Sequence, residues 1–160
     1  MDRLWAPWRE KYIIHSNKKG CIFCIKSKEK QDKKNYIVKR SKHSFSMLNI
    51  FPYNNGHLMV APYRHIKDLE KLREEEQMDI FSLLIESKTL LDKCLKPSGY
   101  NIGINLGRCA GAGYPGHMHI HIVPRWVGDT NFMPLLTGTK VVPQSLDTLY
   151  QRLKECNLSL

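Results

Sequence analysis

Three histidines alternate with apolar residues in the segment Gly116–Pro124. Successive side chains of a β-strand point to opposite faces, so a strand here would carry imidazoles on one face and apolar side chains on the other. The alternating residues are His117, Met118, His119, Ile120, His121 and Ile122. This pattern predicts a strand that packs one face on a core and turns the other toward a site that uses imidazole chemistry. A surface strand with a pH-sensitive or metal-binding row of histidines is the alternative.

Length and composition predict one domain over residues 1–160. Of the 160 residues 42% are hydrophobic, which is enough to bury a core without disulfides. The first ten residues carry charges and two tryptophans where a signal peptide would have its apolar stretch. No later segment is long and apolar enough to span a membrane. We therefore expect a cytoplasmic protein that does not bind membranes.

The cysteines favour metal binding over disulfides. Cys21 and Cys24 lie two residues apart, the spacing of one half of a tetrahedral zinc site, which needs two further ligands from elsewhere in the fold. The odd count of five cysteines, with no secretory signal, favours reduced thiols. Redox-active thiols remain the alternative for the pair. Three cysteines are left without an assigned function and are expected to fill the core or to have no particular role, namely Cys94, Cys109 and Cys156.

The formal charge of +10 indicates a polyanionic partner. Much of the positive charge lies in the lysine-rich stretch 26–42. Such a stretch attracts the phosphates of a nucleotide or of nucleic acid, and a solvated loop has the same composition. The interleaved aromatic residues of a base-stacking surface are missing from it, so nucleic acid is possible but not favoured.

The remaining pattern predicts an α+β fold with an antiparallel sheet. β-Branched and aromatic segments predict four strands besides the histidine strand, at residues 36–40, 44–50, 57–61 and 100–105. The turn at 52–56 joins the second and third strands into a meander. A long helix is predicted from about 73 to 96, and a last helix begins after Ser145, a suitable N-cap.

A glycine-rich loop leads directly into the histidine strand. Its glycines allow backbone N–H groups to converge on an anion, and they are Gly107, Gly111, Gly113 and Gly116. The sequence therefore predicts phosphate next to imidazole. The chemistry implied is attack of an imidazole nitrogen on a phosphoryl group, giving a phosphoramidate intermediate that a second acceptor resolves.

The segment His117-Met-His-Ile-His-Ile-Val-Pro124 resembles the His-x-His-x-His-x-x signature of the histidine triad superfamily of nucleotide hydrolases and transferases. Residues 54–65 resemble that superfamily's earlier strand, and residues 107–116 its phosphate loop. The wider arrangement is similar to the Fhit-like branch that includes diadenosine tetraphosphate phosphorylases, in residues 4–9, 101–107 and 124–132.

This resemblance implies the fold of the histidine triad, or HIT, family. That fold is an α+β domain with an antiparallel meander sheet of about five strands, one long helix and a C-terminal helix. The implied division of the chain is an N-terminal zinc-binding segment at 1–35, a core at 36–126 and a C-terminal extension at 127–160. Pairing through the long helix and the adjoining strands implies a homodimer.

The resemblance also implies roles for the residues that match the family's motifs. His119 matches the nucleophile that attacks the α-phosphate, His121 the third histidine that supports it, and His57 the histidine of the earlier strand. Asn49 matches the position that holds the ribose. The implied phosphate-binding residues are Asn105, Gly111 and Gly113, with His119 and His121.

A structural zinc, one per chain, is implied as the cofactor. Its ligands would be the two cysteines and two histidines at positions that complete zinc sites in triad proteins, namely Cys21, Cys24, His65 and His117. Four protein ligands leave no open position for a substrate water, so this metal would be structural.

The implied activity is that of a nucleotide hydrolase or nucleotidyltransferase acting on dinucleoside polyphosphates through a covalent nucleotidyl-histidine intermediate. One alternative is a module that processes adenylated nucleic-acid ends or binds nucleic acid, and a second is a nucleoside phosphoramidate hydrolase. The chain departs from the family at Gly113-Tyr-Pro-Gly116, where many members place a Gln or Ser. Protonation of the leaving group and choice of acceptor are therefore left open.

Overall fold

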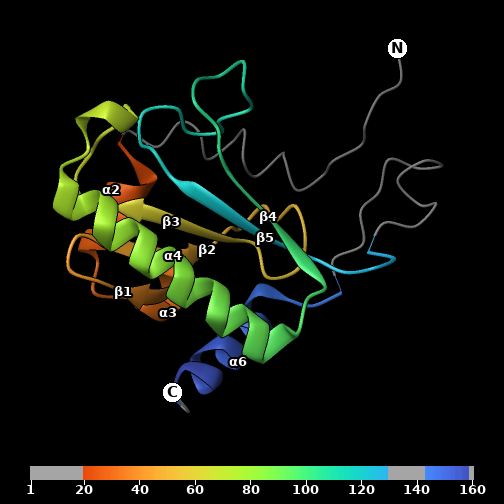
Figure 1. Ribbon diagram of the computed structural model, residues 1–160. Coiled ribbons are helices and arrows are strands. Elements are labelled where there is room, and N and C mark those ends of the chain that lie inside the picture. Colours follow the sequence, from red (N-terminus) through yellow and green to blue (C-terminus); the bar gives the residue numbers. More distant parts are fainter. Residues whose placement is uncertain (1–19, 130–142, 159–160) are drawn as a thin grey trace.

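A five-stranded antiparallel sheet forms the centre of the protein in the computed structural model, which describes residues 20–129 and 143–158 (Figure 1). The strands are β1 (Ile37–Arg40), β2 (Ser44–Leu48), β3 (Leu58–Pro62), β4 (Gly99–Ile104) and β5 (Ile120–Arg125). Their order is β1-β2-β3-β5-β4, and every pairing is antiparallel. The first three strands form the predicted meander. Strand β5 lies between β3 and β4, which places the histidine strand beside the strand that follows His57.

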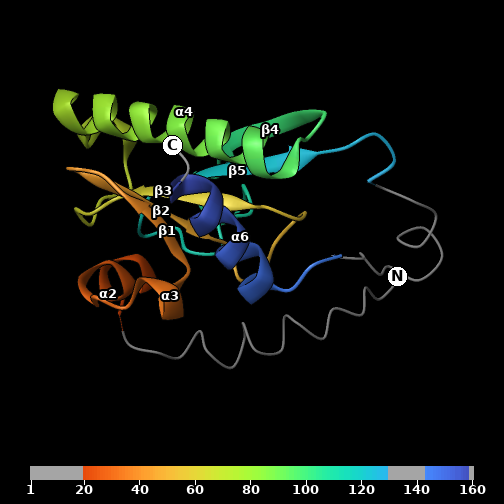
Figure 2. The ribbon, with the colours of Figure 1, turned by 90° about the horizontal axis from the view of Figure 1, so that it is seen from below.

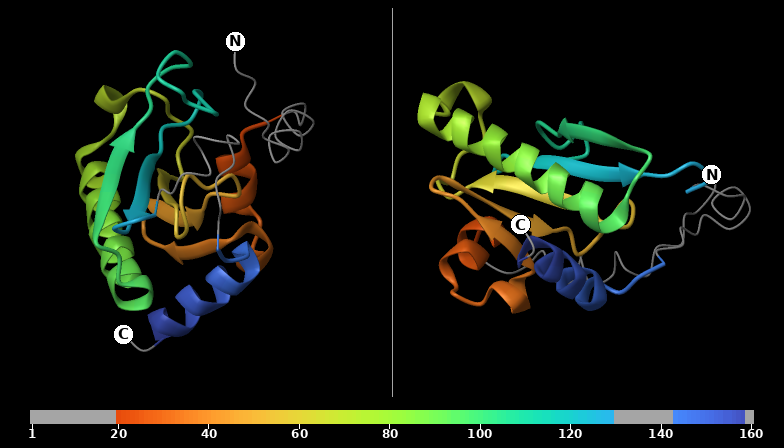
Figure 3. Two further views of the ribbon diagram at one scale, coloured as in Figure 1. Left: turned by 90° about the vertical axis from the view of Figure 1, so that its right-hand side faces the viewer. Right: turned by 60° about the horizontal axis from the view of Figure 1, so that its bottom comes forward.

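Helices cover both faces of this sheet. They are α2 (Ile22–Lys28), α3 (Asp32–Asn35), the short 3-10 helix η1 (Leu69–Lys71), α4 (Glu74–Leu95) and α6 (Leu146–Leu158). Figure 2 shows α4 along one face, with α2 and α3 on the opposite side. Helix α6 contacts both α4 and β1, and Figure 3 shows it beside the C-terminal end of α4. None of the helices in the described ranges is long and apolar enough to cross a membrane.

Alternation along the strands divides the interior into two apolar clusters. On the side of α4 and α6, the larger cluster includes Leu58, Val60, Ile120, Ile122, Leu91 and Leu153. On the side of α2, the smaller cluster consists of Cys21, Phe23, Ile37, Phe45, Met47, Met59 and Ala61. Because both faces are covered, the histidine face of β5 lies within the protein.

Capping interactions mark the ends of the two long predicted helices. Helix α4 begins after Arg73, whose backbone N–H donates to the Glu76 carboxylate at 2.9 Å, and it ends at Lys96, which has a left-handed φ of 49°. Three acidic residues in its first turn favour the helix N-terminus. The Ser145 hydroxyl caps α6 by accepting the Thr148 N–H at 3.2 Å.

The turn before β3 requires glycine at position 56. Gly56 has a φ of +76°, and a Cβ there would lie 2.7 Å from Cδ1 of Leu95 and 3.0 Å from Cγ of Pro124. A side chain would therefore be strained by both the backbone and its neighbours. This close approach packs the turn against the end of α4 and fixes the start of the strand that follows His57.

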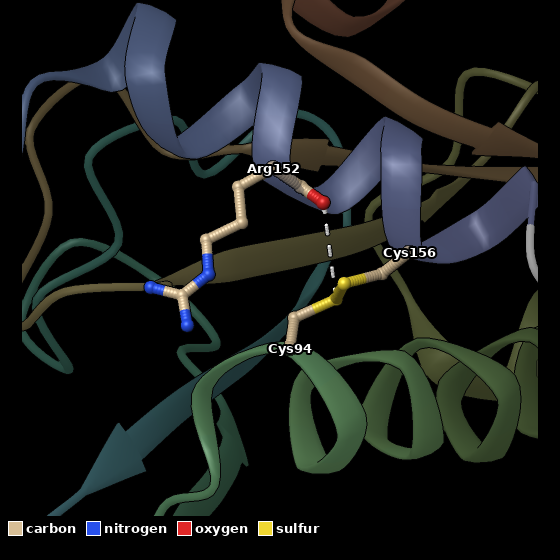
Figure 4. The surroundings of a disulfide bond; sticks show 3 residues. All are labelled: Cys94, Arg152 and Cys156. Carbon is tan, nitrogen blue, oxygen red and sulfur yellow. Dashed lines mark hydrogen bonds between the residues drawn. A yellow bond between two sulfur atoms is a disulfide. The ribbon is translucent and has the colours of Figure 1, made fainter.

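Two cysteines behave differently from the sequence expectation. A disulfide joins Cys94 on α4 to Cys156 on α6, whose Cα atoms are 6.1 Å apart, and Cys94 Sγ lies 4.0 Å from the Arg152 carbonyl oxygen (Figure 4). Cys94 lies in the larger cluster and Cys156 packs against it, so the prediction of core filling is confirmed for both. The expectation that they remain reduced is wrong, because the packing of α6 on α4 brings together residues 62 positions apart. Cys109 lies exposed in the glycine loop, so core filling does not apply to it and the alternative of no particular role stays a prediction.

Parts of the predicted organisation lie outside the described residues. These are residues 4–9, the end of the similar segment at 130–132, and most of the implied zinc-binding segment, 1–19. The described part of that segment, residues 20–35, contains α2 and α3.

Candidate active site and metal centre

The three histidines lie on the face predicted for them, but only His121 is within β5. The pairing of β3 with β5 ends at Val60 and Ile120. Just before Ile120, the Met118 N–H donates instead to the Ile66 carbonyl oxygen, at 2.7 Å. His117 and His119 therefore sit in the segment just before the strand. The side chains of Met118, Ile120 and Ile122 pack in the larger cluster, as the alternation predicts.

All three imidazoles are buried, and burial lowers their pKa values. His117, His119 and His121 are only 1%, 5% and 7% exposed. Burial lowers the pKa of His117 and of His121 to about 4, and it also lowers the pKa of His119. The three side chains are therefore neutral at neutral pH, and each has one N–H and one nitrogen lone pair. The hydrogen-bond partner decides which nitrogen carries the proton.

His119 presents its lone pair on Nε2. Its Nδ1 lies 2.8 Å from the backbone carbonyl oxygen of His117. A carbonyl oxygen only accepts hydrogen bonds, so Nδ1 carries the proton and Nε2 is unprotonated. The ring is held by Phe23 on α2, with centroids 4.7 Å apart. A neutral imidazole fixed in this way is a nucleophile at Nε2.

His121 presents the opposite tautomer through His57. The backbone N–H of Tyr53 donates to Nδ1 of His57 at 3.0 Å, which leaves the His57 proton on Nε2. This Nε2 lies 2.9 Å from Nδ1 of His121, so it donates there and His121 carries its own proton on Nε2. That Nε2 is buried and has no hydrogen-bond partner among the described residues. A buried donor without a partner is costly, and an anionic ligand oxygen would satisfy it.

Sequence reasoning missed Tyr53, which supports this pair from the turn before β3. Its ring centroid lies 4.6 Å from that of His57 and 5.6 Å from that of His121. Asn49, predicted to hold the ribose, lies beside His57, with its Nδ2 atom 3.4 Å from Nδ1 of His57. Its Oδ1 atom accepts the Phe51 N–H at 2.9 Å. The signal for Tyr53 was its place in the turn, but nothing in the sequence shows where its N–H points.

The glycine loop brings two of the predicted phosphate-binding residues together. Nδ2 of Asn105 donates to the Gly111 carbonyl at 3.5 Å, and Gly111 has a φ of +84°. Gly111 and Gly113 are exposed, whereas Ala112 between them is buried. The loop thus has an anchored side and an open side just before the histidine segment.

Two thiols and two imidazoles meet beside the triad, as predicted. The possible ligand atoms of Cys21, Cys24, His65 and His117 all lie within 4.8 Å of one another. Nδ1 of His117 is 3.3 Å from Cys21 Sγ, and Nδ1 of His65 is 3.4 Å from Cys24 Sγ. Two cysteines and two histidines in this arrangement suit tetrahedral zinc.

The protonation states of His117 and Cys24 are compatible with a cation bound in the cluster. Nε2 of His117 lies 2.9 Å from the Pro62 carbonyl oxygen, so it carries the proton and leaves the Nδ1 lone pair facing the cysteines. Burial, followed by the neighbouring Cys21, raises the pKa of Cys24 to about 11. Two adjacent thiols at such a site ionise together only when a cation compensates their charge.

His117 connects the cluster of two cysteines and two histidines to His119. Its ring nitrogen Nδ1 faces the two cysteines, and its carbonyl oxygen accepts the proton-bearing Nδ1 of His119. Phe23, which the sequence did not single out, packs against both rings, with its centroid 5.1 Å from that of His117. Order in the cluster is therefore transmitted directly to the orientation of His119.

The lysine-rich stretch 26–42 is partly neutralised by neighbouring acids. Lys39 pairs with Glu86 at 2.6 Å, and Arg40 pairs with Asp32 at 2.7 Å. Arg40 also donates to the backbone carbonyls of Ser27 in α2 and of Glu29 just after this helix, which gives it a structural role. These contacts weaken the case for a continuous nucleic-acid-binding surface.

The fold and the site together define a histidine-triad protein: strand β5 of a central antiparallel sheet and the segment just before it carry three neutral imidazoles next to a glycine loop. The family model of the HIT domain matches residues 29–127, and the chain belongs to this family.

Named relatives extend the comparison. The chain is 35% identical over 154 residues to an AP-4-A phosphorylase of Mycobacterium tuberculosis, covering 91% of this chain and 79% of that protein. It is 36% identical over 93 residues to the asymmetrical bis(5'-nucleosyl)-tetraphosphatase of Schizosaccharomyces pombe, covering 58% and 50% of the two chains. Among solved structures, a zinc-bound histidine triad family protein from Mycobacterium smegmatis is similar with a TM-score of 0.68 and 25% identity, over 88% of this chain and 94% of that one.

Proposed function

We propose that the protein transfers a nucleotidyl group from a dinucleoside polyphosphate, such as diadenosine tetraphosphate, through a covalent intermediate on His119. The observation that carries this proposal is the pair of fixed tautomers. Nε2 of His119 offers a lone pair, and Nε2 of His121 offers a proton that has no partner among the described residues. The relatives named for diadenosine tetraphosphate chemistry support the substrate class.

In the first step Nε2 of His119 attacks the α-phosphorus. A bond forms between nitrogen and phosphorus, the bond between phosphorus and the bridging oxygen breaks, and its electron pair leaves with the oxygen. With diadenosine tetraphosphate the leaving group is ATP, and adenylyl remains on His119. The His121 N–H donates to a phosphate oxygen, where it stabilises the charge that grows in the transition state.

In the second step an acceptor attacks the same phosphorus and the nitrogen–phosphorus bond breaks. Inorganic phosphate as the acceptor gives ADP, and water gives AMP. Asn49 is proposed to hold the ribose, and the residues proposed to hold the phosphates are Asn105, Gly111 and Gly113. His57 fixes the tautomer of His121 throughout.

The cluster of two cysteines and two histidines is proposed to bind one structural zinc per chain. The ligands are Cys21, Cys24, His65 and His117, and the zinc-bound neighbour supports the metal's identity. Bound zinc supplies folding free energy and fixes the segment before β5. Because four protein groups fill its coordination, the chemistry at phosphorus belongs to the histidines.

A homodimer is proposed as the assembly. Helix α4 exposes three apolar side chains at helical spacing, Met78, Phe81 and Ile85, which are 67%, 62% and 61% exposed. The neighbouring strand β4 is an edge of the sheet and exposes Ile102, which is 48% exposed. A second copy would cover these exposed apolar side chains.

Analytical ultracentrifugation tests the dimer. Phe81→Glu is expected to give a monomer, because it buries a charge in the interface. Val127→Glu, which changes a side chain that is 95% exposed on the loop after β5, is the control and is expected to remain a dimer. A dimeric Phe81→Glu protein would contradict this surface.

Product analysis of diadenosine tetraphosphate turnover tests the activity. ATP and ADP formed only with phosphate present identify a phosphorylase, and ATP and AMP formed without it identify a hydrolase. His119→Ala is expected to abolish turnover, whereas His43→Ala, outside the site, is expected to retain it. No turnover by the wild type under either condition would contradict the substrate class.

A further inference from the structure

Asn54 is a buried polar residue in the turn before β3. It is only 4% exposed, and its amide nitrogen Nδ2 donates to two acceptors on the neighbouring part of the chain. One is the Pro124 carbonyl oxygen in β5, at 3.0 Å, and the other is Oδ2 of Asp129, at 2.7 Å. Burying an amide is costly unless it is bonded in this way. The Asn54 side chain therefore fastens the turn to the C-terminal end of the histidine strand.

The Asp129 carboxylate is the charged member of this link. Its side chain is 9% exposed and accepts two hydrogen bonds from Arg125, from Nε at 2.7 Å and from Nη2 at 3.0 Å. Oδ2 also accepts the backbone N–H of Trp126 at 3.2 Å. A bidentate bond to a guanidinium group holds a carboxylate in one orientation. Asp129 is thus a fixed acceptor for the Asn54 amide.

Backbone hydrogen bonds connect the anchored Asn54 to His57. The Asn54 carbonyl oxygen accepts the His57 N–H at 3.2 Å, which closes the turn. The preceding residue, Tyr53, donates its N–H to Nδ1 of the His57 ring at 3.0 Å. Two consecutive residues of the turn therefore bond to His57, one to its backbone and one to its ring. Holding Asn54 in place keeps the Tyr53 N–H directed at Nδ1.

The hydrogen bonds of Asn54 do more than fill space in the turn. An apolar side chain of similar size would fill the same volume without burying an amide, and Gly56 already packs the turn closely against Leu95. A buried polar group whose partners are all present specifies one arrangement of the chain. The arrangement specified here is the one in which the Tyr53 N–H meets the His57 ring.

We infer that Asn54 is a positioning residue for the proposed reaction, because its anchored side chain holds the Tyr53 N–H on His57. This N–H selects the tautomer of His57 that donates to His121, and thereby the tautomer in which His121 donates from Nε2. The inference rests on the proposed function. It gives Asp129, which no step of the mechanism uses, a role in preparing the donor.

The tautomer of His121, measured by proton–nitrogen NMR at neutral pH, tests the inference. Asn54→Asp has nearly the same shape, but an ionised carboxylate cannot donate and repels Asp129. The wild type is expected to show His121 protonated at Nε2, and the variant a mixture of the Nε2 and Nδ1 forms. Asn101→Ala is the matched control, because Asn101 on β4 accepts from Arg125 Nη1 at 2.8 Å and its removal leaves the bonds of Asn54 in place. The control is expected to keep the wild-type tautomer.

Steady-state kinetics with diadenosine tetraphosphate provide the second readout. In Asn54→Asp, kcat should fall about 10-fold with little change in KM, because the misdirected donor is needed mainly in the transition state. Simple loss of stability would reduce the amount of active enzyme without changing the tautomer in the molecules that stay folded. If Asn54→Asp does not fold, Asp129→Ala removes only the anchor, and the same change of tautomer is expected.

A wild-type tautomer together with a wild-type kcat in the folded variant would overturn the inference. So would a wild type whose His121 carries its proton on Nδ1, whatever the kinetics show. No turnover of diadenosine tetraphosphate by the wild type would instead contradict the proposed function, and the NMR comparison then decides the role of Asn54 by itself.

Discussion

The Nε2 nitrogen of His57, the residue just before β3, lies 2.9 Å from the Nδ1 nitrogen of His121 in the neighbouring strand β5. The Tyr53 N–H behind His57 sets the direction of this hydrogen bond, so a backbone group in a turn decides which nitrogen of His121 carries a proton. His119 receives the opposite tautomer from the carbonyl of His117. In the proposed mechanism these tautomers make His121 the donor and His119 the nucleophile.

Without His57, His121 is expected to lose the hydrogen bond that selects its Nε2-protonated tautomer. In His57→Ala, kcat should fall about 10- to 100-fold with little change in KM, because the His121 N–H would no longer be held toward the charged phosphate, and a hydrogen bond to a charged group is worth about 1.5–3 kcal/mol. His57→Gln, whose amide can still donate, should lose less. Proton–nitrogen NMR of the wild type should show His121 protonated at Nε2, and a His121 protonated at Nδ1 would contradict the proposed relay.

Zinc is expected to contribute to stability and to depend on the cluster. Cys24→Ser should lose the metal, and chelation of the wild type should lower Tm by about 5–10 °C, the effect of a ligand present at about 100 times its Kd. Cys109→Ser, at an exposed cysteine outside the cluster, is the control. Metal analysis and calorimetry measure both effects. Full zinc content in Cys24→Ser would show that the ligand set is wrong.

Glu76 is expected to stabilise the protein above a pH set by its salt bridge. The Arg64 guanidinium lowers the pKa of this carboxyl from 4.5 to about 2, with the Glu76 Oε1 atom 2.8 Å from Arg64 Nε. Because the pKa is lower in the folded state, the stabilisation is complete above pH 4.5 and is lost as pH falls toward 2.

Urea unfolding of Glu76→Gln tests this linkage. At pH 7 the variant should be less stable by about 1.5–3 kcal/mol, and the difference from wild type should shrink as pH falls below 4.5. Glu75→Gln, where the carboxylate side chain is 58% exposed, should lose less than about 0.5 kcal/mol. A difference that is independent of pH would contradict the assignment.

Alanine substitutions at Gly56 and Gly128 distinguish the cost of backbone strain from the cost of steric overlap. Both have positive φ, 76° and 80°, but a Cβ at Gly128 meets nothing within 4 Å. Gly128→Ala should therefore cost only the backbone strain, about 1–2 kcal/mol. Gly56→Ala should cost about 1–3 kcal/mol more, because its Cβ would collide with Leu95. Equal losses of unfolding free energy for the two variants would contradict the close packing of this turn.

The sequence predicted those elements whose signals are local. The long helix, predicted from about 73 to 96, is found at residues 74–95 because the repeat of its apolar residues lies within the segment itself. The alternation around His119 correctly assigned Met118, Ile120 and Ile122 to the core. What the alternation could not show was that α2 covers the other face, since that contact joins Phe23 to residues almost a hundred positions away.

The remaining features depend on which elements pack together. The four possible metal ligands were named through the family resemblance, since spacing within the sequence identifies only the two cysteines. The bond between Cys94 and Cys156 required the docking of α6 on α4, for which the sequence has no pairing signal. The Tyr53–His57–His121 relay depends on the direction of one backbone N–H, which residue type does not encode.

Trapping the covalent intermediate tests the central proposal most directly. The enzyme is mixed with diadenosine tetraphosphate, stopped within a single turnover, digested under non-acidic conditions and analysed by mass spectrometry. The account predicts one adenylyl group on the peptide that contains His119, in wild type and in His43→Ala, and none in His119→Ala. Turnover with no adduct on His119, or an adduct on a different residue, would contradict it.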